Sequence, residues 1–112
     1  MKHNHGRKHS GRFPFAVLAA FALLKSISKE PSHGYRLVEE LSRAFEREIP
    51  RPMVYKLLRA LEERGLVESK WDFPQDGPAR KVYYITDKGL EVLERMGEQL
   101  KKLKDIIERL IS

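Results

Sequence analysis

The hydrophobic residues in the first half of the chain recur at steps of three and four, the spacing of a helix with one buried face. They form three runs: Val17, Leu18, Phe21, Leu24 and Ile27; Leu37, Val38, Leu41 and Phe45; and Val54, Leu57, Leu58 and Leu61. Prolines separate the runs, because proline suits the first turn of a helix and breaks its interior. The pattern predicts three helices with short connections.

Polar and glycine residues mark the predicted helix ends. The first helix begins at Phe13-Pro14 and ends before Glu30-Pro31. Ser32 is placed to cap the second helix, and Gly65 to end the third. These positions allow only short connections between the helices.

From Leu66 the pattern changes to that of a β-hairpin. Leu66–Trp71 and Lys81–Ile85 are short and rich in strand-forming residues, and the turn-rich segment Pro74–Pro78 lies between them. Thr86 then offers an N-cap, with Asp87 in the first turn of a helix that runs to residue 112.

That last helix carries a heptad-like apolar stripe, formed by Leu93, Met96, Leu100, Leu103, Ile107 and Leu110. Such a stripe must pack on its own domain or on a partner, and we favour a homodimer. Ile106 and Ile111 widen the stripe, so the first helix of the partner is a further candidate contact. The predicted fold is mainly α with a small β-hairpin: a winged helix-turn-helix over residues 13–86, then a C-terminal dimerisation helix over residues 87–112.

Composition is that of one folded domain of 112 residues, with 41% hydrophobic and 34% charged residues. The chain has no cysteine, which excludes disulfides and thiolate metal sites, and we expect a cytoplasmic protein. The apolar segment Phe13–Leu24 is too short to cross a bilayer, so we expect no membrane span.

The net charge of +6 favours an anionic partner, but its distribution matters more. Residues 1–12 contain four of the basic residues and no acidic residue, so residues 13–112 carry a net charge of only +2. Residues 1–12 lack apolar periodicity and are predicted to form a disordered basic arm, either a solvated tail or a DNA-following one.

Three helices followed by a hairpin is the order of a winged helix-turn-helix, in which the third helix enters the DNA major groove and the hairpin is the wing. Arg51, Lys56 and Arg59 lie on the outer face of the third helix, with Met53 beside them. Two further cations, Arg80 and Lys81, lie on the return strand of the wing. Because two separate segments place cations where DNA would lie, we predict binding to double-stranded DNA.

A set of short motifs supports this interpretation: His33-Gly34-Tyr35, Val54-Tyr55 with Leu58, Leu61-Glu62, Gly65-Leu66-Val67, Trp71, Arg80 with Tyr83 or Tyr84, Thr86 and Gly89. Their order and spacing resemble the PadR-like transcriptional regulators over Leu18 to Gly89. The resemblance implies a winged-helix repressor that dimerises through its C-terminal helix and lacks a separate effector domain.

The resemblance also implies phosphate contact at the start of the second helix, where Ser32, His33 and Tyr35 lie. A structural role for His33 or Tyr35 is the alternative. The family usually has small residues where this chain has Arg51-Pro52-Met53, so we expect the bases read to differ from those of relatives.

Three other residues have expected roles. Gly34 is expected to allow close packing. Tyr55 lies beside the core stripe and is expected either to face DNA or to support the wing. Trp71 is expected to cover the core from the hairpin, because aromatic side chains gain much from burial.

We expect no catalytic, cofactor or metal site, since the sequence has no cysteine, no glycine-rich phosphate loop and no histidine pair at ligand spacing on one element. The alternatives to a sequence-specific regulator are a winged-helix protein-interaction module and a non-specific DNA-binding protein. A small-molecule effector is a further hypothesis, although the C-terminal helix has no aromatic residues to line a pocket.

Overall fold

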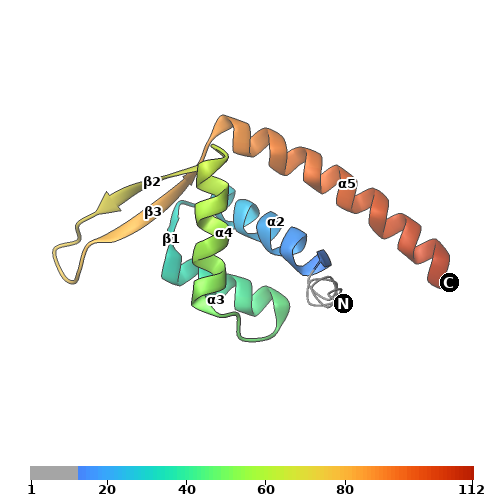
Figure 1. Cartoon of the computed structure of the whole chain (residues 1–112), viewed down its shortest axis with the longest axis horizontal. Coiled ribbons are helices and arrows are strands. Elements are labelled where there is room, and N and C mark those ends of the chain that lie inside the picture. Colours follow the sequence, from blue (N-terminus) through green and yellow to red (C-terminus); the bar gives the residue numbers. More distant parts are fainter. Residues whose placement is uncertain (1–12) are drawn as a thin grey trace, which may run out of the picture.

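The computed structural model describes residues 13–112, and the predicted basic arm lies outside the described residues. The described elements follow one another in the order α2 (Phe13–Lys29), β1 (Ser32–His33), α3 (Gly34–Phe45), α4 (Arg51–Glu63), β2 (Val67–Asp72), β3 (Arg80–Ile85) and α5 (Asp87–Ile111). Strands β2 and β3 form a wing that projects from one side of the three-helix core, and α5 extends from the other side (Figure 1). The predicted winged-helix architecture with its long C-terminal helix is confirmed.

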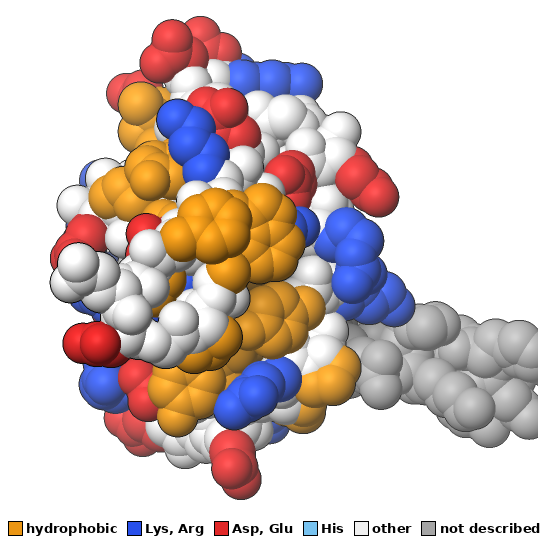
Figure 2. Space-filling view, turned by 90° about the vertical axis from the view of Figure 1, so that its left-hand side faces the viewer, with side chains coloured by type: hydrophobic (Ala, Val, Ile, Leu, Met, Phe, Trp, Pro, Cys, Tyr) orange, Lys and Arg blue, Asp and Glu red, His pale blue; other side chains and the backbone are white. Residues whose placement is uncertain are grey.

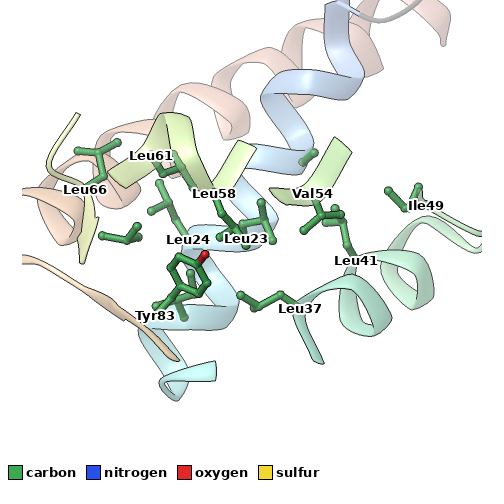
Figure 3. Close-up of a cluster of buried hydrophobic side chains, with 13 residues drawn as sticks. Leu23, Leu24, Leu37, Leu41, Ile49, Val54, Leu58, Leu61, Leu66 and Tyr83 are labelled. Carbon is green, nitrogen blue, oxygen red and sulfur yellow. The ribbon is translucent and has the colours of Figure 1, made fainter. Parts of the chain in front are cut away.

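The core forms where α2, α3, α4 and the base of the wing meet (Figure 3). The largest fully buried side chains are Leu23, Leu24, Ile27, Leu37, Leu41, Val54, Leu58 and Val67. The predicted core face of α4 is therefore correct. On α2 the prediction for Val17 and Leu18 is wrong, since both are exposed. The face that α2 buries runs instead through Ala19, Leu23 and Ile27, four residues apart.

The start of α3 is capped by His33 and not, as predicted, by Ser32. The backbone N–H of Arg36 donates to Nδ1 of His33 over 3.3 Å. Ser32 is buried in strand β1, and its hydroxyl donates to the carbonyl oxygen of Glu30 over 3.1 Å. The serine hydroxyl is thus engaged before the helix begins.

Strand β1 makes the sheet three-stranded, a feature that the sequence pattern did not predict. The strand order is β1-β3-β2, and both pairings are antiparallel. Ser32 pairs with Tyr83, which ties the start of α3 to the wing. Gly65 follows α4 with φ +75°, as expected for the residue after a helix C-cap.

The first turn of α5 is capped by Thr86, as predicted: the N–H of Gly89 donates to Oγ1 of Thr86 over 3.0 Å. Val92, Leu93 and Met96 then pack against the domain core. From residue 101 onward every residue of α5 is exposed. In the part of the chain that the structure describes, no helix is both long and apolar enough to span a membrane.

Candidate nucleic-acid interface

The outer face of α4 presents the predicted cations. Arg51, Lys56 and Arg59 are exposed, and the Arg51 guanidinium carbon lies 5.1 Å from the ring centroid of Tyr35 on α3. Met53, which the sequence places beside these cations, is half-buried and packs against the core. A flexible methionine side chain in a first helical turn can reach back over the core in this way. The surface that α4 offers is therefore mainly cationic.

The start of α3 lies against α4 through a close contact between Gly34 and Tyr55. A Cβ atom at Gly34 would lie 2.6 Å from the hydroxyl oxygen of Tyr55, so only glycine lets the ring approach. The expected packing role of Gly34 is confirmed. Tyr55 is half-buried against the core, so its ring joins the two helices. Tyr35, next to Gly34, remains half exposed.

The wing carries its two predicted cations on opposite faces, because side chains alternate along a strand. Arg80 forms an ion pair with Asp72 across the hairpin, with Nε 3.5 Å from Oδ2. The ammonium group of Lys81 lies 5.9 Å from the centre of the Trp71 ring, which belongs to its cross-strand partner. Trp71 is 59% exposed, so the prediction that it covers the core is wrong.

A groove of about 610 Å³ lies between the start of α3, α4 and the wing. It brings together six residues that the sequence singled out: His33, Tyr35, Tyr55, Arg59, Arg80 and Lys81. Arg51 and Lys56 lie outside its lining, on the same helix as Arg59. Trp71, Tyr83 and Glu62 also line the groove and were not predicted as site residues. The cross-strand position of Trp71 beside Lys81 is the signal that could have included it.

Glu62 is the one acidic residue in the lining of this groove. Its carboxylate accepts a hydrogen bond of 2.7 Å from the hydroxyl of Ser69 on β2. Burial, followed by the nearby charge of Glu62, raises the pKa of Tyr83, which therefore stays a neutral phenol at physiological pH. The lining of the groove thus carries three cations, Arg59, Arg80 and Lys81, against the single carboxylate of Glu62.

Arg36 on α3 does not line the groove and is held by acidic neighbours. It forms ion pairs of 3.0 Å with Glu30 and 3.2 Å with Glu40. The hydrogen bond and the charge of Arg36 hold the pKa of Glu30 below its usual value. Arg36 is thus neutralised by local partners, whereas Lys56 and Arg59 form no ion pair with any residue from 13 to 112.

The predicted dimerisation stripe divides between two environments. Leu93, Met96 and Leu100 are half-buried, and the first two pack on their own domain. Leu103, Ile107 and Leu110 are 46–78% exposed. Within residues 13–112, no cluster of three or more histidine or acidic residues could hold a metal ion.

Comparison with known proteins adds independent findings. Residues 23–95 match the sequence profile of the Transcriptional regulator PadR-like family. A protein of Thermoplasma acidophilum is 31% identical, with 87% of this chain and 93% of that chain covered and a TM-score of 0.78. A PadR family transcriptional regulator from Eggerthella lenta is 30% identical, with 96% of each chain covered and a TM-score of 0.74. A PadR-like transcriptional regulator from Bacillus cereus is 27% identical, with 95% of this chain and 97% of that chain covered and a TM-score of 0.76. A search of curated protein sequences gave no significant match.

Proposed function

The chain belongs to the PadR-like family of transcriptional regulators, and on this premise we propose that it represses transcription as a homodimer bound to a palindromic operator in double-stranded DNA. The observation that carries the proposal is that Arg59 on α4 and Lys81 on the wing line one groove, with Arg51 and Lys56 exposed on the same helix as Arg59. Helix α4 is the element that would enter the major groove.

The proposed contacts have separate tasks. Arg51, Lys56 and Arg59 would read bases or bind phosphates from the major groove, and Met53 would contribute only its exposed edge. His33 and Tyr35 would contact the backbone beside α3, and Lys81 and Arg80 would contact it from the wing. Ser32 is left out of this proposal because its side chain is buried.

The proposed dimer rests on the apolar residues that the single chain leaves in water. On α5 these are Leu103, Ile106, Ile107, Leu110 and Ile111, and on α2 they include Val17 and Leu18. Exposed apolar residues in such number on one helix are uncommon on a monomer and are typical of a subunit interface. A symmetric dimer would also present two copies of α4 to the two halves of a palindrome.

Selection from a pool of random duplexes at near-physiological salt tests sequence specificity. We expect recovery of an inverted repeat with half-sites about one helical turn, roughly 34 Å, apart. Binding without any enriched repeat would support the non-specific alternative, and no binding would contradict the proposal.

A charge-matched pair of variants tests the docking face. The double variant Lys56→Ala/Arg59→Ala is expected to abolish operator binding and leave the dimer intact. The control, Arg64→Ala/Lys88→Ala, removes two exposed cations that do not lie on α4, one just after its end and one on α5, and should weaken binding far less. Equal losses in the two double variants would mean that only net charge matters, and would contradict docking through α4.

A further inference from the structure

Trp71, the one tryptophan of the chain, lies on the wing with 59% of its surface exposed. Phe73, two residues further along, is 76% exposed. Viewed toward the tip of the wing, hydrophobic side chains gather at the centre of the surface, with both basic and acidic side chains around them (Figure 2). Large apolar side chains grouped on a surface mark a binding site, and the groove that Trp71 lines also contains the cations Arg59 and Lys81, which indicate an anionic partner.

The register of the hairpin shows which way Trp71 points. Side chains alternate along β2, so Trp71 shares a face with Ser69, whose hydroxyl bonds to Glu62 of α4. On β3 the same face carries Lys81 and the buried Tyr83. Trp71 and Lys81 therefore continue the α4-directed face of the wing beyond the end of the core.

The groove beneath this face has the chemistry of a nucleic-acid backbone site. Arg59 contributes a cation from α4 and Lys81 another from the wing, while Tyr35, Tyr55 and Trp71 supply aromatic surface. Arginine and lysine bind phosphate oxygens, and an aromatic ring packs on the apolar carbons of deoxyribose. With α4 in the major groove, the strand that borders that groove must pass beside α4, where the wing stands.

We propose that Trp71 is a further contact to the operator, with its ring against a deoxyribose of the backbone strand that Arg59 and Lys81 would hold. The inference rests on the proposed function, because it names the part of the DNA that the same surface holds. It adds Trp71 as a DNA-contacting residue.

Because Trp71 is the one tryptophan, its fluorescence reports on the groove directly. Titration with the selected operator duplex should change the emission and saturate at the same concentration as fluorescence anisotropy of labelled DNA. Trp71→Ala should weaken binding about tenfold, the size typical of one aromatic contact to nucleic acid. Trp71→Phe, which keeps an aromatic face, should stay within about twofold of the wild type.

Two wing lysines provide the matched control. Lys81 and Lys70 are both exposed, and each lies over an aromatic ring, Trp71 and Tyr84 respectively, but they lie on opposite faces of the hairpin. Lys81→Ala should lower the slope of log affinity against log salt by about one, the value for one lost phosphate contact. Lys70→Ala removes the same charge and should leave that slope unchanged.

Unchanged tryptophan emission at saturating DNA, or equal effects of the two lysine variants, would overturn the inference. The proposed function would then stand, since the wild type would still bind its operator. Emission that shifts on dilution without DNA would place Trp71 at a subunit contact and would also overturn it. If the wild type bound no duplex, the proposed function would fall first.

Discussion

Helix α5 carries one apolar pattern through two different environments. In its first half Gly89 is buried and Val92, Leu93 and Met96 pack on the core of the same domain. In its second half Leu103, Ile107 and Leu110 continue the pattern with no cover from residues 13–112. The comparison teaches that periodicity predicts which side of a helix is apolar, whereas the surrounding fold decides what covers it.

The two halves of α5 differ in their surroundings because the helix is longer than the domain core beside it. Helix α5 has 25 residues and is about 37 Å long at 1.5 Å per residue, and the core that it leaves behind is shorter. Its first turns lie beside α2 and the base of the wing, and its last turns project beyond them (Figure 1). The same spacing therefore supports intramolecular packing at one end and, in our proposal, dimerisation at the other.

The largest effect is expected at the packed end, from Gly89→Ala. The added Cβ would overlap the carbonyl oxygen of Leu66 and lie 2.7 Å from Cγ1 of Ile85. Backbone cannot move aside as a flexible side chain can, so we expect a loss of about 3 kcal/mol in the free energy of unfolding, as for overpacked cores. Urea denaturation measures it. A loss below about 1 kcal/mol would show that the packed half is looser than the structure indicates.

At the exposed end, the double variant Leu103→Lys/Ile107→Lys should weaken the proposed dimer without unfolding the domain. Both side chains are about half exposed in the single chain, so the fold of the domain should remain intact. Charges placed in a buried subunit interface lack partners, and we expect the dimer dissociation constant to rise by at least about 100-fold. Sedimentation velocity over a concentration series measures it.

The control for that variant replaces two exposed lysines of the same half, Lys101→Ala/Lys102→Ala. These substitutions leave the apolar face unchanged and should shift the dissociation constant by less than about fivefold, as expected for peripheral charges. A dimer that survives the double lysine substitution would move the subunit contact away from the second half of α5.

The sequence predicted the helices, the hairpin and the Thr86 cap because each depends on contacts within a few residues. It did not predict strand β1, because two residues are too short to show a pattern and their pairing with β3 is long-range. The cap at His33 was missed because Ser32, the better capping residue by type, is held by the sheet. The residue types alone therefore could not show which of Ser32 and His33 caps α3.

The site shows the same limit. The cations of α4 and of the wing were predicted from composition and helical geometry, and the structure brings Arg59 and Lys81 to one groove. The exposure of Trp71 depends on how far the hairpin extends beyond α4, and a local sequence pattern cannot predict that distance. The half-burial of Met53 likewise depends on the path that its flexible side chain takes over the core.

A smaller effect is expected from the cap of α5, through Thr86→Ala. The Thr86 hydroxyl accepts from the N–H of Gly89 and donates to the carbonyl oxygen of Gly65 over 2.6 Å. Loss of this N-cap should lower the free energy of unfolding by about 1.5 kcal/mol, within the usual range for such caps. Thr86→Ser keeps the hydroxyl and should cost less than half as much. Thermal denaturation compares the two variants, and equal losses would assign the effect to the methyl group instead.

The smallest effect, and the one that sharpens the comparison most, is Gly97→Ala between the two halves of α5. A Cβ at Gly97 would lie 3.7 Å from Cε1 of Phe21, an ordinary van der Waals contact, whereas Gly89 has no such room. Replacing a mid-helix glycine by alanine should therefore stabilise the chain by about 0.5–1 kcal/mol. Thermal denaturation at several protein concentrations tests this. Stabilisation at every concentration would mean that Gly97 contacts only its own chain. Destabilisation confined to high concentration, where the proposed dimer would form, would extend the subunit contact into the groove between α2 and α5.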